Sequence, residues 1–506
     1  MRISDGETRE QGDGIEVSAR IDGFRLWFRV PGSGKVSGMG DPFVAAALLP
    51  AMLQGEGLEV DRELAVSPRL LEHLGRLQEI HHCWNPIFKI VPVRAAGTPA
   101  PGLNRGVLTF FSGGVDSTYT FLKRREELTH LVFIQGFDFY ASPAVTGSFA
   151  ADEIADLSQL AFKLSGRRRG VDGFLASRLT KRTGDELAAL GRRGRIPDGL
   201  EVRLAGELED VLRGPAIWDD RRFAGAALRP ATRELLKDAA QGGTSYLLNR
   251  RLVEDAYPLE IARRDDSVYH RAIERNARFA GEAGKTLITV STNHFAFGYR
   301  YNLSRNLTQG SALASVALLL GFPKVYLPAA YSYNQLIPLG SHPLTDPLWS
   351  NESVEIVHDG GEARRVDKVV RVAGDEAALA NLRVCFTDMN RNCGRCSKCL
   401  RTMIPLARLG VPGAPFPPLP PLRELRRLRV ANDIEKIFFE ENLDPALRSR
   451  EVRLDRALRA SMRRYERQRW LKDLDRVVLR GSLKRLLRRG AAAEAAPLRI
   501  DTTPPR

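Results

Sequence analysis

The sequence has few cysteines and no long hydrophobic run. Only five cysteines occur in 506 residues, and four of them share one short window. This distribution argues against a disulfide framework and favours a metal site in a reducing cytosol. The longest apolar run, residues 312–322, falls well short of the ~20 residues that a membrane helix needs. The start, MRISDGETREQGDG, is polar and acidic and lacks a signal-peptide pattern. We therefore expect a cytoplasmic protein without a membrane partner.

Acidic residues are outnumbered by basic ones. Lysine and arginine total 76 against 61 aspartates and glutamates, which gives a formal charge of +15. This excess suits an anionic partner, but charge alone does not distinguish a nucleic acid from a nucleotide or a lipid. Hydrophobic residues make up 43% of the chain, enough for a sizeable core. At ~150 residues per domain, the length allows about three domains.

One stretch, residues 108–122, organises the rest of the chain and reads LTFFSGGVDSTYTFL. Residues 107–111 have the composition of a buried strand, and a helical pattern opens at Val115. A Ser-Gly-Gly tripeptide, residues 112–114, lies between them. A helix that begins directly after such a loop offers unpaired N–H groups and a positive dipole end to an anion. Glycine also allows a phosphate to approach the backbone closely.

Asp116 is an unexpected neighbour for a phosphate unless a cation bridges the two, which indicates Mg²⁺. Ser112 and Ser117 can add hydroxyl donors to the same loop. We expect Asp116 and Ser117 to be the catalytic residues of this site.

A second buried strand, residues 131–135, follows the first helix. This spacing implies a right-handed parallel crossover, and ligands of such sheets bind at the carboxyl ends of the strands. Gly136 and Asp138 should therefore lie beside the loop, with Gly136 among the ATP-binding residues. Asp138 would either bind a ribose hydroxyl, a substrate amino group or a metal, or cap the next element.

Further candidates for substrate binding follow a later strand or lie in a proline-containing loop. They are Asn293, Arg300, Arg305, His342 and Asp346. The two arginines suit a substrate carboxylate or an ATP phosphate, unless they only cap helices or form surface ion pairs. The histidine and the aspartate belong to the loop 340–349 and are either acid–base or orienting groups, or structural residues.

The cysteine-rich segment reads VCFTDMNRNCGRCSKCLRTM. Its cysteines are Cys385, Cys393, Cys396 and Cys399. Two overlapping C-x-x-C units and a fourth thiol supply the four soft ligands that a tetrahedral Zn²⁺ requires. Since four thiolates leave no position for water, the zinc would be structural. An iron–sulfur cluster also accepts four cysteines and is the alternative.

SGGVDS matches the pyrophosphate loop of the PP-loop ATP pyrophosphatase superfamily. Together with the later C…CGRCSKC segment, it resembles the 7-cyano-7-deazaguanine synthases and their less characterised relatives. The resemblance covers residues 107–138 and 385–399 and, less clearly, residues 285–349. It implies a structural zinc on the cysteines and an ATP site in the loop. By resemblance, the ATP-binding residues are Ser112, Gly113, Gly114, Val115, Asp116 and Ser117.

In that family a carboxylated deazaguanine is adenylated, ammonia displaces AMP to give an amide, and a second ATP drives dehydration to a nitrile. The present chain is much longer than usual for the family and shows no glutaminase, so ammonia or an amine must come from outside. One alternative is a ligase that joins a deazaguanine-type carboxylate to a protein amine. Another is a PP-loop tRNA-modifying enzyme with an iron–sulfur cluster. A third is a non-catalytic nucleotide-binding module.

Composition shifts divide the chain into segments around this expected α/β core, a parallel-sheet PP-loop ATPase fold. The segments are a small N-terminal α+β accessory domain with its linker (1–105), the core (106–140 and 266–384), a mainly helical insertion (141–265), the four-cysteine zinc-binding region (385–412), and a basic helical extension with a disordered tail (413–506). The insertion or the extension would contact a protein or RNA partner. Within the first segment we expect disorder to about residue 14, a hairpin turn at Asp22-Gly23, and Asp41 as a helix N-cap.

Overall fold

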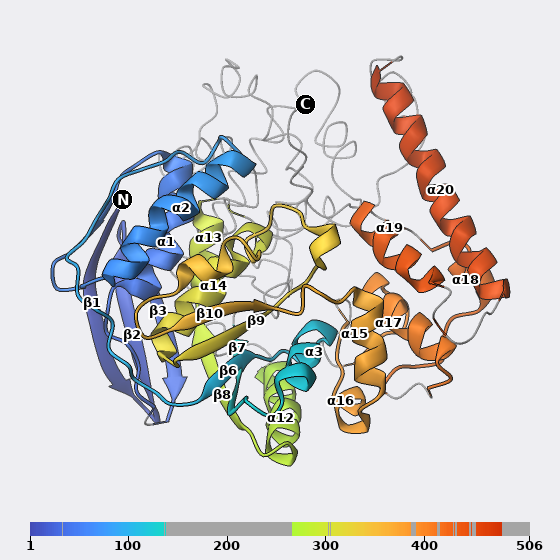
Figure 1. Cartoon of the computed structure of the whole chain (residues 1–506), viewed down its shortest axis with the longest axis horizontal. Coiled ribbons are helices and arrows are strands. Elements are labelled where there is room, and N and C mark those ends of the chain that lie inside the picture. The colour runs from blue at the N-terminus through green and yellow to red at the C-terminus, as the bar shows by residue number, and fades with distance from the viewer. Residues whose placement is uncertain are drawn as a thin grey trace, which may run out of the picture.

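The computed structural model describes residues 1–32, 34–135, 137, 266–301, 303, 305–385, 391–411, 415–428, 430, 433–444, 447 and 452–477 (Figure 1). The predicted insertion and the end of the predicted tail lie outside these residues. Within the described ranges, none of the helices combines the length and the hydrophobicity that crossing a membrane requires.

The strands within the described residues belong to one sheet. They are β1 (Arg2–Gln11), β2 (Gly14–Ile21), β3 (Phe24–Pro31), β4 (Leu58–Val60), β5 (Val93–Arg94), β6 (Val107–Phe110), β7 (His130–Gln135), β8 (Thr286–Thr292), β9 (Lys324–Pro328) and β10 (Glu355–Asp359). The ten-stranded order is β10-β9-β6-β7-β8-β3-β2-β1-β4-β5. Strands β10 to β8 in this order pair in parallel, β3, β2 and β1 continue antiparallel, and β4 and β5 are again parallel. The α/β class with a mostly parallel sheet is confirmed.

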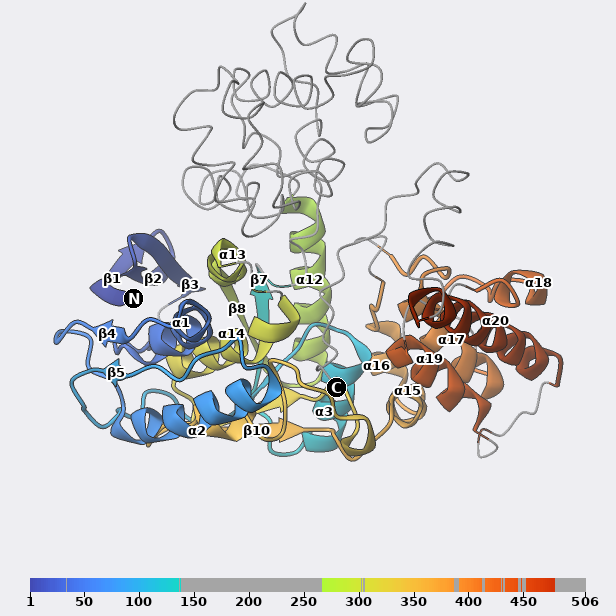
Figure 2. The same cartoon turned by 90° about the horizontal axis from the view of Figure 1, so that it is seen from above.

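Helices cover both faces of this sheet. They are α1 (Asp41–Gln54), α2 (Pro68–Trp84), α3 (Val115–Arg124), α12 (Asp266–Glu282), α13 (His294–Arg300), α14 (Arg305–Leu320), α15 (Arg365–Ala373), α16 (Glu376–Ala380), α17 (Ser397–Arg408), α18 (Leu422–Leu425), α19 (Asp433–Glu440) and α20 (Val452–Val477), with 3₁₀ turns η4 (Tyr333–Gln335), η5 (Asp346–Trp349) and η6 (Glu441–Leu443). Figure 2 shows β1 to β3 at one end of the molecule and α17 to α20 at the other.

Side-chain alternation along β6 separates two hydrophobic cores. Leu108 and Phe110 pack in one core with α1 and α14, whereas Phe111 packs in the other with residues of α3, α12 and α15. Alternation of this kind is expected for a parallel strand covered on both faces. The residues that follow β6 therefore emerge between two helical layers.

The N-terminal segment shares its sheet with the core. Strand β3 pairs antiparallel with β8, with Phe28 opposite Thr292. Helix α1 and helix α14 contribute to one continuous hydrophobic cluster. The segment 1–105 is thus fused to the core through backbone pairing and through packing.

Two local expectations for the N-terminal segment are wrong and one is confirmed. Residues 2–11 form strand β1, paired with β2 from Ile3 opposite Ile21 to Gln11 opposite Gly14. This stretch is polar, and its composition therefore predicted disorder. Backbone hydrogen bonds to β2 order it instead. The Asp22-Gly23 hairpin is confirmed, because β2 and β3 pair up to Ile21 opposite Phe24.

Asp41 is not the N-cap of α1, since Gly40 takes that position. The Asp41 carboxylate is buried and accepts hydrogen bonds from the Ser67 amide and from Asn351 Nδ2, both at 2.8 Å. Burial raises the pKa of Asp41 despite these hydrogen bonds. The side chain therefore joins three separate segments, a role that its position beside a proline did not reveal.

Candidate nucleotide site and candidate metal centre

The SGGVDS loop connects β6 to α3 at the carboxyl end of a strand that has parallel neighbours on both sides. Gly113 has φ +74°, a left-handed conformation that favours glycine. Hydrogen bonds close the loop: the Ser112 amide donates to Ser117 Oγ at 3.3 Å, and Ser117 Oγ donates to the Gly114 carbonyl at 3.1 Å. Gly114 is the N-cap of α3 and has no side chain to cap it, so the positive end of the helix dipole has no side-chain cap.

The space around position 113 also requires glycine. A Cβ there would stand 3.1 Å from Asn276 Oδ1 and 3.5 Å from both Arg275 Nη2 and Asn381 Nδ2. The Gly113 carbonyl accepts a hydrogen bond from the Arg383 amide at 2.7 Å. The loop is therefore enclosed on this side by α12 and by the segment that follows α16.

The donors on this side of the loop are only partly satisfied. Arg275 Nε and Nη2 and Asn276 Nδ2 are buried and have no hydrogen-bond partner among the described residues. Burial, together with the neighbouring Arg383 charge, lowers the pKa of Arg275 to about 10. Each unsatisfied buried donor costs about 1–3 kcal/mol, a cost that a bound anion would remove. Sequence reasoning missed this pair, because the helical pattern drew attention to the apolar positions of α12.

A second group of cations lies on the other side of the loop. Asp116 Oδ2 is 2.6 Å from Arg365 Nη1, and Asp116 Oδ1 is 3.3 Å from Lys368 Nζ. Lys368 Nζ also donates to the Ala329 carbonyl at 2.6 Å. The Arg365 and Lys368 side chains are 6% and 1% exposed. Burial favours the neutral acid, but these two cations outweigh it and hold the pKa of Asp116 below its ordinary value.

These ion pairs bear on the sequence argument for Mg²⁺, which assumed an uncompensated carboxylate beside phosphate. Arg365 and Lys368 supply compensation from the chain itself. Magnesium at Asp116 stays a prediction.

On the Asp116 side of the loop, the cationic side chains outnumber the single Asp116 carboxylate. Arg401 and Lys398, from α17, add to the field that lowers the pKa of Asp116. The Arg401 guanidinium carbon lies 4.4 Å from the Phe438 ring centroid. Burial and the Arg365 charge lower the pKa of Arg401 to about 10. In the described part of the chain, Nε of Arg365 and Nε of Arg401 have no hydrogen-bond partner. The group as a whole is suited to a polyanion.

The four predicted metal ligands converge. Cys385 Sγ and Cys396 Sγ are 3.8 Å apart, Cys393 Sγ and Cys399 Sγ are 4.0 Å apart, and all four sulfurs lie within 4.8 Å of one another. A tetrahedral zinc with Zn–S bonds of about 2.3 Å separates its sulfurs by about 3.8 Å. The site is thus compatible with a structural metal such as zinc. A multi-iron cluster would hold the thiolates further apart, because several irons and sulfides separate them.

Local backbone geometry builds this metal centre. Gly394 has φ +70°, and a Cβ there would stand 2.4 Å from Pro417 Cγ. Cys393 Sγ accepts the amides of Arg395 and Cys396 at 3.4 and 3.3 Å, as in a knuckle that turns back on its ligand. The Cys396 hydrogen bond and burial raise the pKa of the Cys399 thiol. A divalent cation would favour the thiolates instead.

The metal centre and the loop are physically connected. The Val384 amide donates to Asn392 Oδ1 at 2.9 Å, next to the Arg383 amide that binds the Gly113 carbonyl. The cysteines share a hydrophobic core with Val115 and other residues of α3. Helix α17 starts at the metal centre and carries Arg401 toward Asp116. A metal there would hold both the segment before the knuckle and α17 against the loop.

Several of the predicted substrate residues make hydrogen bonds within the protein. Asn293 Oδ1 accepts the Trp27 amide at 2.9 Å and Nδ2 donates to the Arg25 carbonyl at 2.8 Å, so both ends of its amide bind β3. The side chains of Arg300, at the end of α13, and Arg305, at the start of α14, lie outside the described part, as do Gly136 and Asp138.

His342 and Asp346 come together in a buried cluster. Asp346 is fully buried and accepts Ser341 Oγ at 2.7 Å, His358 Nδ1 at 2.6 Å and the His342 amide at 3.1 Å. The His342 ring lies 4.9 Å from the Trp84 ring of α2. Burial and the nearby His358 charge lower the pKa of His342. These contacts fit the structural interpretation of the two residues.

His294 is a candidate site residue that sequence reasoning did not select. It begins α13 directly after β8, at the same sheet edge as the loop, and is 1% exposed. Both of its ring nitrogens have no hydrogen-bond partner in the part that the structure describes. Burial lowers the pKa of His294 to about 3. A neutral, unsatisfied imidazole at a strand's carboxyl end is suited to hydrogen-bonding a ligand, and its position beside Asn293 was the available signal.

Comparisons with known proteins find no match for this chain: no family model, no curated protein and no solved structure matches it.

Proposed function

We propose that this chain binds ATP at residues 112–117 and uses it to activate a carboxylate by adenylation, with release of pyrophosphate, before forming an amide or a nitrile. The observation that carries the proposal is the arrangement of cationic donors on both sides of a glycine loop at a parallel strand's carboxyl end. Arg275 lies on one side, and Arg365 and Arg401 lie on the other, each with an unsatisfied nitrogen within the described residues.

In the proposed reaction, a carboxylate oxygen of the substrate attacks the α-phosphorus of ATP. The bond from that phosphorus to the bridging oxygen of the β-phosphate breaks, and pyrophosphate leaves with the electron pair. An amine nitrogen then attacks the acyl carbon, AMP leaves, and the amine loses a proton to give the amide. In the nitrile-forming version, the amide oxygen attacks the α-phosphorus of a second ATP and pyrophosphate leaves. The nitrogen then loses its two protons as the bond from carbon to oxygen breaks, and AMP leaves with that electron pair to give the nitrile.

The chain's own residues would bind and orient the phosphates. The loop backbone and the α3 dipole would hold one phosphate group, while Arg275 and Asn276 would donate to it from α12. Arg365, Lys368 and Arg401 would stabilise the charge that develops on the leaving pyrophosphate. Mg²⁺, if bound through Asp116, would neutralise phosphate charge in the same place. Zinc on the four cysteines would have no chemical role and would support the loop.

The resemblance to 7-cyano-7-deazaguanine synthases supports a carboxylated deazaguanine as the acid and ammonia or an external amine as the nucleophile. A protein amine would serve equally in this chemistry. The sulfur spacing favours a single structural metal over a multi-iron cluster, which supports the ligase over a tRNA-modifying enzyme with an iron–sulfur cluster. A protein or RNA partner at the insertion or at the basic extension stays a prediction of the same scheme.

The test is an assay of pyrophosphate and AMP from ATP, Mg²⁺, ammonium and a panel of heterocyclic carboxylates. We expect Gly113→Ala to abolish ATP binding, because the new Cβ crowds Asn276 and the backbone is left-handed. Gly23→Ala is the matched control: Gly23 also has a positive φ but no atom within 4 Å of its Cβ position. ATP binding without pyrophosphate release would point to the non-catalytic module. Absence of ATP binding by the unaltered chain would overturn the proposal.

A further inference from the structure

Helix α20 is half packed and half exposed. Leu454, Ala457, Leu458 and Met462 are buried in a cluster with α17 and α19 residues such as Leu400 and Phe439. From Arg463 to Leu471, the described part contains no buried side chain. Figure 1 shows this end of α20 extending past α19, away from the body. Between Arg463 and Leu471, Tyr465 is partly buried against the cluster and the other side chains are exposed.

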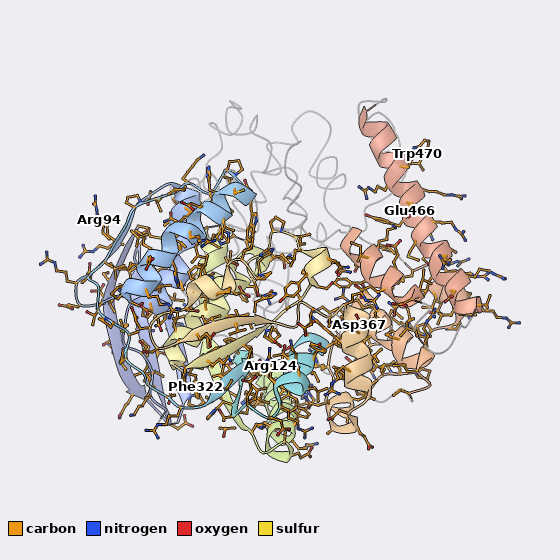
Figure 3. The ribbon with its side chains drawn as sticks, in the orientation of Figure 1. Arg94, Arg124, Phe322, Asp367, Glu466 and Trp470 are labelled. Atoms are coloured by element: carbon orange, nitrogen blue, oxygen red, sulfur yellow. The ribbon has the colours of Figure 1, made fainter. Side chains whose placement is uncertain are left out.

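One face of α20 carries arginines and a tryptophan. Its residues, hereafter the arginine face, are Arg456, Arg459, Arg463, Arg467 and Trp470, and all are exposed. Their separations of three or four residues place them along one side of a helix. At about 1.5 Å per residue, the face extends over about 21 Å. Trp470 is 62% exposed and lies beyond Glu466 in the C-terminal part of α20, as Figure 3 shows.

Two acidic side chains that the structure describes on this helix form ion pairs with neighbouring helices. Asp455 forms an ion pair with Arg408 of α17, and Glu466 is 3.0 Å from Lys436 Nζ of α19. These pairs hold the Asp455 and Glu466 carboxylates close to α17 and α19. The arginine face thus carries four exposed arginines, and the glutamate at its border, Glu466, is paired with Lys436.

We propose that the arginine face binds single-stranded nucleic acid, with its guanidinium groups on consecutive phosphates and Trp470 stacked on a base. Arginine binds phosphate with paired N–H donors, and a row of arginines matches a chain of regularly spaced charges. An exposed tryptophan at the end of the row adds a flat apolar surface, which an unpaired base covers and an acidic polypeptide does not. This site is independent of ATP.

The test measures binding of the full chain to fluorescently labelled single-stranded RNA, single-stranded DNA and duplexes, without ATP and at several salt concentrations. In the variant Arg459→Gln/Arg463→Gln/Arg467→Gln, we expect affinity at low salt to fall at least about tenfold. Each phosphate contact contributes about 0.7 to the slope of log affinity against log salt, so loss of three should flatten it by about 2. The altered side chains are exposed, so far-ultraviolet circular dichroism should match the unaltered chain.

A matched control removes the same charge elsewhere. Arg62→Gln/Arg76→Gln/Arg94→Gln replaces three exposed arginines of the N-terminal segment and should leave affinity and slope unchanged. Trp470→Ala should weaken single-strand binding about tenfold and leave duplex binding unchanged. Equal losses in both triple variants, binding only to an acidic polypeptide such as polyglutamate, or no nucleic-acid binding would each overturn the proposal. Pyrophosphate release from a small carboxylate should persist in the Arg459/Arg463/Arg467 variant, so the two proposals fail separately.

Discussion

Asp116→Asn tests how the candidate nucleotide site is assembled. In the unaltered chain, Asp116 faces Arg365 and Lys368, two side chains with almost no solvent exposure. Asparagine keeps the shape of the side chain but leaves both cations without a counter-charge. Breaking a buried ion pair in this way costs about 3 kcal/mol, less here to the extent that the 27% exposed Asp116 is already screened. We therefore expect the ligand-free variant to unfold at lower denaturant concentration.

ATP should reverse most of that loss, because its phosphates can replace the missing carboxylate as the partner of Arg365 and Lys368. A ligand that binds only the folded chain stabilises it according to its concentration relative to its dissociation constant. We expect the gap in stability between Asp116→Asn and the unaltered chain to narrow as ATP is added. Pyrophosphate release should nevertheless fall, since the cations would be positioned by ground-state ATP instead of by Asp116.

The pH dependence gives an independent check with a defined sign. The folded-state pKa of Asp116 is lowered by its cations, so the unfolded chain binds more protons in the acid range. The stabilisation from Asp116 is therefore fully present above the unfolded pKa, about 3.9, and is lost as pH falls through the lower folded value. The difference in unfolding free energy between the unaltered chain and Asp116→Asn should be constant from about pH 8 to about pH 5 and shrink below about pH 4.

Two results would refute this reasoning. Equal stability of the two proteins at neutral pH without ATP would show that Asp116 does not compensate buried cations. A variant that binds ATP normally but no longer responds to Mg²⁺ would instead assign Asp116 to the metal, as the sequence argument predicted. Asp116→Leu combined with Arg365→Met and Lys368→Met serves as the control, because replacing all three charged partners by apolar groups leaves no unpaired charge and should cost less than Asp116→Asn.

Three further predictions concern other parts of the site. Cys399→Ser, or removal of metal with a chelator, should lower both the metal content and the affinity for ATP, because a metal on the cysteines would support the loop through Arg383. Elemental analysis and an ATP-binding assay measure the two quantities. Unchanged ATP binding by metal-free, folded protein would contradict the prediction. Arg275→Met should leave the free energy of unfolding equal or higher but weaken ATP binding at least about tenfold. The reason is that the buried Arg275 donors without a hydrogen-bond partner are unfavourable until an anion binds. Titration calorimetry with ATP measures the affinity, and an unchanged affinity would count against the prediction. His294→Phe should stabilise the chain increasingly as pH falls below about 6.5, because the pKa of His294 in the folded chain is lowered to about 3 and the unfolded chain alone takes up the proton. Pyrophosphate release should fall in the same variant. Full activity of the variant would show that His294 has no role in the reaction.

Short-range features of this chain were determined by the sequence itself. The strand–loop–helix transition at residues 107–124, the Asp22-Gly23 hairpin and the cysteine quartet were all predicted from residues close together in the chain. The physical reason is that each depends on local backbone geometry: a positive φ at glycine, a helix that starts after a loop, or thiols on one turning knuckle. No distant partner is needed to specify them.

Tertiary structure alone decided what surrounds the loop. Arg275 reaches Gly113 from α12, and Arg365 reaches Asp116 from a helix that begins 249 residues later in the chain. Strand β1 is ordered by its pairing with β2, and Asn293 is occupied by the backbone of β3. These contacts follow from the order of strands in the sheet, which brings together segments whose sequences carry no mutual signal. Local sequence specifies the glycine loop between β6 and α3, whereas its charge environment depends on long-range packing.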